Sequence, residues 1–288
     1  MTAKVTAFAP AKINLTLHVT GQRTDGYHLL DSLVAFADIG DEIEACAAPN
    51  MSLFVSGPMS EGVPSDSRNL MLKAAKLFDP SGTAALSLTK HLPAASGIGG
   101  GSSDAAATLR ALAELWDLPL PRTEDVLPLG ADLPVCLCPS PQRMSGIGEK
   151  LERLPSLPAC EILLVNPGIE VATPSIFKTL TSRDNAPMPD VLPNWRSAED
   201  LAAWLHTQRN DLEPPACGLA HEISDALSAL EATNPLIARM SGSGATCFAL
   251  FPANSAKTDT ALDAIQQAHP NWWVKSGRFF SLAENIPG

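Results

Sequence analysis

A glycine- and serine-rich run between an alternating segment and an apolar helical pattern constrains this chain most. Residues 84–89 alternate apolar and polar side chains, which predicts a strand, and residues 103–116 carry an apolar stripe at helical spacing. Between them lie the glycine-rich residues 97–101, with Ser102 or Ser103 as the expected N-cap of the helix. Glycines let the backbone approach an anion, and a helix N-terminus favours negative charge. The run therefore predicts a phosphate site.

The familiar phosphate-binding motifs do not fit this run. A P-loop needs a lysine directly after the last glycine, and none follows Gly101. The dinucleotide fingerprint that would start at Gly97 has Ser102 where its last glycine belongs. A tight turn without a ligand is the alternative. Three consecutive glycines cost about 1 kcal/mol each relative to alanine, which favours a bound phosphate.

Composition excludes several classes of protein. The 288 residues carry a formal net charge of −11 and no run of Lys or Arg, which argues against a nucleic-acid partner. The first residues lack the pattern of a signal peptide, and no apolar run is long enough to span a membrane. Cys136 and Cys138, expected on a strand, do not have the spacing of metal ligands, so the six cysteines read as reduced structural thiols of a cytoplasmic protein. A thiol or metal protein is the alternative, and no metal ligands are predicted.

Other segments show the alternation of strands or the spacing of helices. Residues 11–19 predict a half-buried strand with Lys12 and Asn14 side by side on its polar face. Two strands are expected at 33–38 and 41–45, on either side of Ile39-Gly40, and a helix is expected to begin near Asn69. A Pro-rich passage at 140–160 indicates a boundary between two lobes. Beyond it the sequence predicts strands at 162–166, 245–251 and 272–280, helices at 198–206, 218–231 and 257–268, and an exposed loop at 182–196.

Asp132 lies between Gly130 and Pro134, directly before a segment read as an apolar strand. Alone it would be an ordinary turn aspartate. Phosphoryl transfer, however, needs a held polyphosphate, a carboxylate that accepts a hydroxyl proton and a cation for the developing charge. Asp132, Lys12 and the glycine-rich run together supply these three parts.

Four segments in this order resemble the GHMP small-molecule kinases: PAKINL at 10–15, the segment 93–106 that contains the glycine-rich run, GADLP at 130–134 and SGSGA at 241–245. Further segments narrow the resemblance to family members that phosphorylate a cytidine diphosphate derivative of 2-C-methyl-D-erythritol: residues 21–28, 69–70, 166–168, 173–177 and 210–213.

The resemblance implies an α+β fold of two lobes: a ribosomal protein S5 domain 2-like N-terminal lobe at 1–153 and a ferredoxin-like C-terminal lobe at 154–288. Whether the last strand returns to the N-terminal lobe is left open. The active site would lie in the cleft between the lobes. Asp132 would be the general base and Lys12 the catalytic cation. ATP would be bound by Lys90, Pro93, Ala94, Ala95, Ser96, Gly97, Ile98, Gly99, Gly100, Gly101, Ser102 and Ser103.

Substrate recognition by the same resemblance falls to Asn14, Tyr27, His28, Thr173 and Phe177, with the aromatic rings around the cytosine. The implied reaction is ATP-dependent phosphorylation of the 2-hydroxyl in the non-mevalonate isoprenoid pathway, with Mg²⁺ accompanying ATP. Monomer and homodimer both remain open. Two alternatives remain: another GHMP kinase, acting on mevalonate, homoserine or a sugar, and a non-catalytic nucleotide-binding protein of the same fold.

Overall fold

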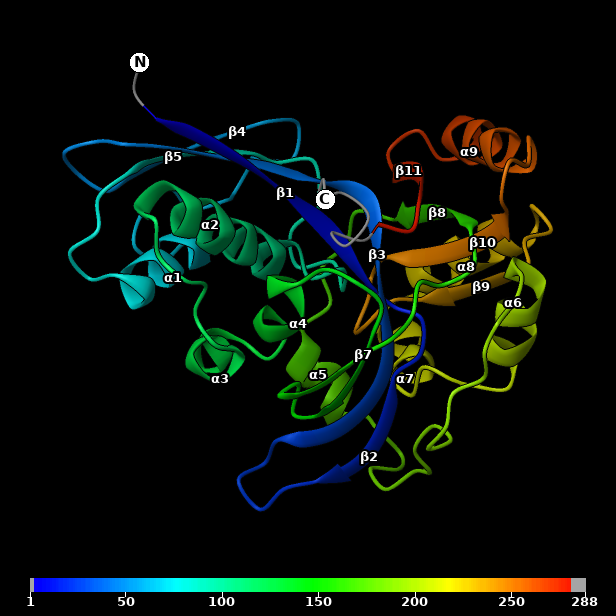
Figure 1. Ribbon diagram of the computed structural model, residues 1–288. Coiled ribbons are helices and arrows are strands. Elements are labelled where there is room, and N and C mark those ends of the chain that lie inside the picture. The colour runs from blue at the N-terminus through cyan, green and yellow to red at the C-terminus, as the bar shows by residue number, and fades with distance from the viewer. Residues whose placement is uncertain (1–2, 281–288) are drawn as a thin grey trace. The chain divides into compact units, whose positions relative to one another are not determined.

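The computed structural model describes residues 3–280 and divides into two compact units, each built from separate stretches of chain (Figure 1). The first unit comprises residues 3–12, 40–94 and 99–139, and the second comprises 13–39, 95–98 and 140–280. These contact-based units cross the expected boundary at residue 153. The single cut between 1–153 and 154–288 stays a prediction. No helix in the described range has the length and apolar character that a membrane crossing needs.

The first unit packs helices on a sheet. Its sheet joins β4 parallel to β5, β5 antiparallel to the C-terminal part of β3, and β3 to β1. Apolar side chains of this sheet and of α1 and α2 form its core, with Leu86 and Leu112 among the buried members. The elements are β1 (Lys4–Asn14), the part of β3 (His28–Cys46) from Gly40 onward, β4 (Ser52–Ser56), α1 (Leu70–Phe78), β5 (Ala85–Thr89), α2 (Gly100–Trp116), α3 (Thr123–Val126), the 3₁₀ turn η1 (Leu127–Leu129) and α4 (Leu133–Leu137).

The second unit contains two sets of strands. In one, β2 and β6 pair antiparallel with the N-terminal part of β3, and β7 pairs with β6. The other is a four-stranded sheet described below. The elements are β2 (His18–Gln22), β6 (Gln142–Gly146), β7 (Lys150–Arg153), β8 (Cys160–Asn166), α5 (Thr173–Lys178), α6 (Ala198–His206), α7 (Glu213–Leu219), α8 (His221–Glu231), β9 (Ile237–Met240), β10 (Cys247–Pro252), α9 (Lys257–Ala268) and β11 (Trp273–Arg278).

The four-stranded sheet has the order β11-β8-β10-β9 and is antiparallel throughout. In chain order this is 4-1-3-2, with helices between the first and second strands and between the third and fourth, as a ferredoxin-like lobe requires. Phe251 of the sheet, Ile223 and Leu230 of α8 and Ile265 of α9 meet in its core. The last strand lies in this sheet, and beyond it Phe279 forms a single bridge to Ala37 of β3. The α+β class is confirmed.

Three sequence-based predictions of strands are wrong. Residues 28–46 form one strand rather than two separated at Ile39-Gly40. The strand at 11–19 is broken after Asn14 and is buried on both faces, because its polar side chains have partners inside the protein. Cys136 lies on α4 rather than on a strand, and burial raises the pKa of its thiol to about 12. The expected helices at 198–206 and 257–268 are confirmed.

Gly40 is a site of close strand approach rather than a break. A Cβ at this position would lie 2.3 Å from the carbonyl oxygen of Ala9 on β1, which is far inside contact distance. Any side chain would therefore push the paired strands apart. The glycine that suggested a turn in the sequence in fact permits a long strand to continue.

We expect Gly40→Ala to destabilise the protein by about 1–3 kcal/mol, because the added methyl group overpacks the β1–β3 contact. Urea unfolding followed by circular dichroism measures the change. The matched control is Gly218→Ala on α7, where an added Cβ meets nothing within 4 Å and alanine favours the helix. Equal stability of Gly40→Ala and wild type would contradict the proposed close approach.

Candidate active site

The glycine-rich run leads directly into the N-terminus of α2. The helix begins at Gly100, and its N-cap is Gly99 in the left-handed conformation with φ of 64°, not Ser102 or Ser103 as predicted. No side chain of the described residues caps it. The first N–H groups of a helix have no partner within the helix, so this 17-residue helix begins with donors available to an anion.

The glycines of the run serve different purposes. Gly97 and Gly99 both have positive φ, and a Cβ on Gly97 would lie 2.5 Å from the carbonyl oxygen of Ser241. A tight turn explains these two. Gly101 has ordinary helical geometry, and a Cβ there would meet nothing within 4 Å. Its lack of a side chain keeps open the space beside the helix N-terminus, which a turn alone does not require.

Lys12 and Asp132 meet in the first unit. The Lys12 ammonium lies 2.7 Å from Oδ1 of Asp132, with the lysine side chain 3% exposed and the aspartate 37%. A Cβ on Gly99 would lie 3.1 Å from the Lys12 Cβ, so the lysine stem lies against the glycine-rich run. The structure thus brings together the predicted cation, the predicted base and Gly99 of the glycine-rich run.

Asp132 is held by the short helix that follows it. It directly precedes α4, and Leu133 N–H donates to the Gly130 carbonyl. At the other end of α4, the Arg110 guanidinium donates to the Cys136 carbonyl at 2.8 Å and to the Phe8 carbonyl of β1 at 2.7 Å. Burial lowers the pKa of Arg110 to about 10. This contact ties α4 to the strand that carries Lys12.

Lys90 lies in a buried cluster with two carboxylates. Its ammonium contacts Asp41 and lies 2.8 Å from Oδ2 of Asp104 on α2. Asp41 also accepts the backbone N–H groups of His91 and Leu92, where the chain enters the glycine-rich run. Burial opposes the charge of Lys90, but Asp104 and Asp41 outweigh it and raise its pKa. Lys90 thus links the chain on both sides of the glycine-rich run, and its ammonium is paired with Asp41 and Asp104.

The remaining predicted loop residues are divided between the units. Pro93 and Ala94 belong to the first unit, and residues 95–98 belong to the second. There the Ser96 carbonyl accepts the Thr246 N–H at 3.0 Å, and the Gly97 carbonyl accepts the Ser241 hydroxyl at 3.1 Å. In the first unit the Ser103 hydroxyl donates to the Pro10 carbonyl. Three predicted residues not yet placed are buried Ile98, Ala95 with φ of 48°, and half-buried Ser102.

Asn14 is fully buried in the second unit but not fully bonded. Its amide nitrogen Nδ2 donates to the Ser32 hydroxyl at 2.7 Å, and its backbone N–H donates to the Ser241 hydroxyl at 3.1 Å. Oδ1 has no hydrogen-bond partner among the described residues. A buried acceptor without a partner costs free energy, which suits a side chain that contacts a ligand.

The other four predicted substrate residues also lie in the second unit. His28 at the start of β3 stacks on Phe177 of α5, with ring centroids 4.3 Å apart and planes inclined by 18°. Its Nε2 is buried and unbonded among the described residues, and burial together with the charge of Arg183 lowers its pKa. Tyr27, beside it in sequence, is 59% exposed. The Thr173 hydroxyl lies 2.8 Å from that of Ser243.

Sequence reasoning missed Asp41 and Asp104 as partners of Lys90 and missed Ser32 as the partner of Asn14. The pairs are separated by 49, 14 and 18 residues, and no periodicity connects them. Asp104, near the start of α2, faces Lys90. The sequence singled out the segment 241–245 as a family motif, but it did not predict that the Ser241 hydroxyl bonds to Asn14 and Gly97.

Lys90→Met should destabilise the first unit by about 3–5 kcal/mol, because it leaves two buried carboxylates without their cation.

Asp104→Asn is the matched partner variant. Burial, followed by the charge of Asp41, raises the pKa of Asp104. A raised folded-state pKa means that stability is lost as pH rises from the ordinary aspartate range toward that value. The unfolding free energy of Asp104→Asn, measured in urea at pH 5 and pH 8, should therefore change less than that of wild type. An equal pH dependence would contradict the arrangement.

Two family models match separate stretches of the chain. A model of the GHMP kinase N-terminal domain matches residues 69–140, and one of the GHMP kinase C-terminal domain matches residues 191–275. The chain is 56% identical to 4-diphosphocytidyl-2-C-methyl-D-erythritol kinase of Ruegeria pomeroyi over 95% of its length and 99% of the relative. The corresponding kinase of Cereibacter sphaeroides is 58% identical over 94% and 98%.

Solved structures agree. A 4-(cytidine 5'-diphospho)-2C-methyl-D-erythritol kinase has a TM-score of 0.74 at 29% identity, covering 95% of this chain and 98% of its own. Homoserine kinase from Cytophaga hutchinsonii has a TM-score of 0.65 at 17% identity, covering 96% and 95%, and that likeness concerns the fold alone. On these matches, the chain belongs to the GHMP kinase family.

Proposed function

We propose that the chain transfers the γ-phosphoryl group of ATP to the 2-hydroxyl of 4-diphosphocytidyl-2-C-methyl-D-erythritol, giving the 2-phosphate and ADP in the non-mevalonate isoprenoid pathway. Relatives named for this substrate, 56–58% identical over nearly the whole chain, support the choice of acceptor. The observation that carries the chemistry is the ion pair between buried Lys12 and half-buried Asp132.

In this proposal Asp132 is the general base. Its Oδ1 is held by Lys12, and its side chain is exposed enough to receive a hydroxyl group. As the hydroxyl oxygen attacks the γ-phosphorus in line with the leaving ADP oxygen, the carboxylate takes the hydroxyl proton. The buried Lys12 ammonium orients the carboxylate and stabilises the charge on the transferring group.

The phosphates of ATP would bind at the N-terminus of α2, where the N–H groups of Gly100, Gly101 and Ser102 begin the helix. The remaining nucleotide residues proposed for this loop are Pro93, Ala94, Ala95, Ser96, Gly97, Ile98, Gly99 and Ser103. For Lys90, whose ammonium is engaged by Asp41 and Asp104, we propose that it orders the loop. Mg²⁺ would arrive on the nucleotide, since it commonly binds through phosphates, and the described residues contain no group of three metal-binding side chains.

The acceptor would be recognised in the second unit. The stacked rings of His28 and Phe177, with exposed Tyr27 beside them, suit the flat face of cytosine. The unbonded Nε2 of His28 can bond to the base edge, and the unbonded Oδ1 of Asn14 can accept from a substrate hydroxyl. Thr173 would contribute a further hydroxyl contact. An aromatic pair of this kind has no purpose for mevalonate or homoserine, which lack a base.

Asp132→Asn should lower kcat by about 10²–10⁴, because it removes the proton acceptor while leaving the side-chain shape nearly unchanged. ADP release with ATP, Mg²⁺ and the cytidine substrate measures it. The matched control is Asp125→Asn, an exposed aspartate of the same unit that pairs with Arg122. Wild-type turnover in Asp132→Asn would exclude Asp132 as the base.

Gly101→Ala should raise the KM for ATP by about tenfold or more, equivalent to about 1.4 kcal/mol, without lowering the stability of the protein. The added methyl group meets no protein atom within 4 Å, so only a ligand can be displaced by it. Kinetics with varied ATP and thermal unfolding without nucleotide check the two parts. An unchanged KM would indicate that the helix N-terminus does not hold the phosphates.

A further inference from the structure

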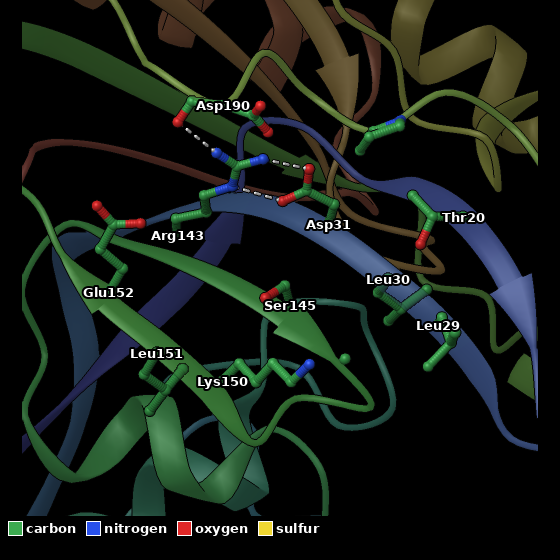
Figure 2. Close-up of a pocket in the computed structure, with 12 residues that line it drawn as sticks. Thr20, Leu29, Leu30, Asp31, Arg143, Ser145, Lys150, Leu151, Glu152 and Asp190 are labelled. Atoms are coloured by element: carbon green, nitrogen blue, oxygen red, sulfur yellow. Dashed lines mark hydrogen bonds and ion pairs between the residues drawn. The ribbon is translucent and has the colours of Figure 1, made fainter.

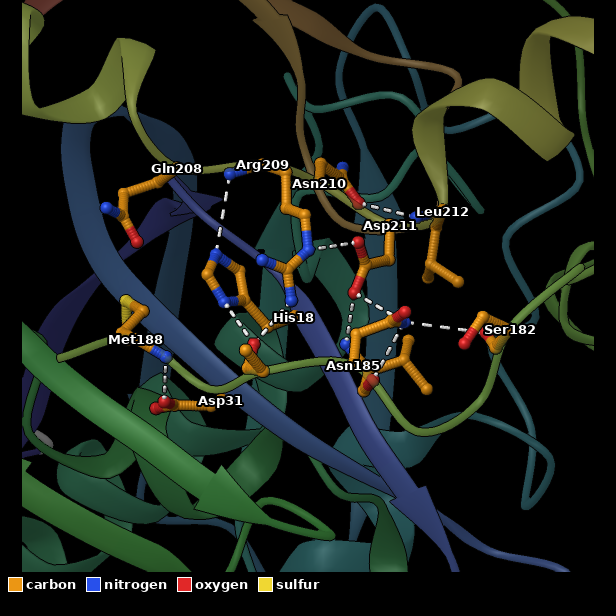
Figure 3. Close-up of polar contacts among 12 residues, drawn as sticks. His18, Asp31, Ser182, Asn185, Met188, Gln208, Arg209, Asn210, Asp211 and Leu212 are labelled. Carbon is orange, nitrogen blue, oxygen red and sulfur yellow. Dashed lines mark hydrogen bonds and ion pairs between the residues drawn. The ribbon is translucent and has the colours of Figure 1, made fainter.

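The segment that follows α5 lacks helix and strand over residues 181–196, as the sequence predicted, but it is not a free loop. Residues 185–190 are bonded to β2, β3 and β6 through buried charged side chains (Figures 2 and 3). Met188 within it is 1% exposed, and its sulfur accepts the Thr16 hydroxyl at 3.1 Å. Such a density of polar contacts on an irregular segment calls for a reason.

The first contact is a buried ion pair between strands β3 and β6. Arg143 binds Asp31 through two parallel hydrogen bonds of 2.8 and 2.7 Å, and Asp31 also accepts the Met188 N–H at 2.8 Å. The other donors of Arg143 bind the carbonyl groups of Met188, Pro189 and Asp190, and Figure 2 shows the bond to Asp190. Two of the five N–H groups of the guanidinium thus bind Asp31, and the other three hold the segment.

A cavity lies beside this ion pair. It measures about 480 Å³, and Arg143, Lys150 and Glu152 are among its lining residues. Because all five N–H groups of Arg143 bind Asp31 or carbonyl groups of the segment, Arg143 has no donor left for a ligand in this cavity. The role of Arg143 is structural.

The second contact holds the same segment at β2. Asp211 accepts the Val19 N–H at 2.7 Å and the Asn185 amide at 3.2 Å, and Asn185 in turn donates to the Val19 carbonyl (Figure 3). Arg209 binds Asp211 at 2.6 Å and also the Ala186 carbonyl. Asp211 thus satisfies the N–H group of Val19 on β2, and Asn185 satisfies its carbonyl group.

His18 completes the contact as a neutral side chain. Its Nε2 accepts the backbone N–H of Arg209 at 3.4 Å. Its Nδ1 therefore carries the proton and donates to the Ala186 carbonyl at 3.2 Å. Burial, followed by the charge of Arg209, lowers the pKa of His18 and keeps it uncharged. The segment is therefore fixed at both Ala186 and Met188.

These contacts connect to the aromatic pair through short stretches of chain. The segment begins a few residues after α5, which carries Phe177. On the other side, Gln22 of β2 pairs with His28 of β3. Fixing residues 185–188 against β2 and β3 fixes the chain on both sides of the His28–Phe177 stack. A displacement of either end would change the 4.3 Å ring separation.

We propose that Asp31, Arg143 and Asp211 are positioning residues for nucleoside recognition: they hold residues 185–190 on strands β2 and β3 and thereby set the geometry of the His28–Phe177 pair. None of the three contacts the reacting groups of the proposed reaction. The inference rests on the proposed function, because it takes the aromatic pair to be the cytidine site.

The test compares Asp31→Asn, Arg143→Met, their double variant and Asp211→Asn with wild type. Each variant should raise the KM for the cytidine substrate and the Kd for cytidine 5'-diphosphate about tenfold, with the KM for ATP within about twofold. The double variant should have the same KM and Kd for the cytidine compounds as Arg143→Met, since both remove the same contact. Native-state trypsin cleavage after Arg183 or Arg196 should accelerate in every variant, because the segment is released.

A general loss of stability is separated by Leu230→Ala, which removes core volume on α8 without touching the segment. This control should keep the wild-type KM for both substrates at a comparable loss of stability. The proposal is overturned if the cytidine constants stay at wild-type values while trypsin cleavage accelerates, if cleavage does not accelerate, or if Leu230→Ala reproduces the KM change. A wild type that neither turns over nor binds cytidine 5'-diphosphate would instead refute the proposed function, and this inference with it.

Discussion

The ion pair between Lys12 and Asp132 is the contact on which the active part of the first unit depends. A lysine with 3% of its side chain exposed needs a carboxylate partner, because a buried ammonium without one is costly. That need fixes the strand end at Lys12 against the start of α4, and Arg110 fixes the other end of α4 to the same strand. The geometry that suits a general base is thus also the geometry that folding requires.

The proposed phosphate site relies on local groups rather than on net charge. Its formal charge is −11, and the cations nearest the glycine-rich run, Lys12 and Lys90, are both paired with carboxylates. In the proposed reaction, attraction for ATP would therefore come chiefly from backbone N–H groups at the start of α2 and from the dipole of that helix. The open space at Gly101 fits this division of labour, because a backbone site works only where the anion can approach closely.

Local patterns predicted local structure well. The strand at 84–89, the helix after the glycine-rich run and the helices at 198–206 and 257–268 follow from spacing alone. Spacing could not show that Gly40 lies against Ala9, because only the paired strand reveals the close approach. It also could not distinguish a helix from a strand over the short apolar stretch at 133–137.

The site was predictable only as far as ordered motifs reached. Lys12, Asp132 and the glycine-rich run were named from the chain, and the structure brings Lys12, Asp132 and Gly99 together. The partners of Lys90 and the bonds from Asp31 to Arg143 and Met188 join residues 14 to 157 positions apart, which neither periodicity nor composition can relate. The polar segment at 182–196 looked like a solvated loop because its partners lie on other strands.

The most direct test of the proposed reaction is the identity of the product. Wild-type protein incubated with ATP, Mg²⁺ and 4-diphosphocytidyl-2-C-methyl-D-erythritol would be followed by ³¹P NMR. The proposed reaction predicts a new phosphomonoester signal on the erythritol carbon 2, growing in step with ADP while the cytidine diphosphate signals stay intact. Release of inorganic phosphate without a monoester, or no change in the nucleotide, would contradict it.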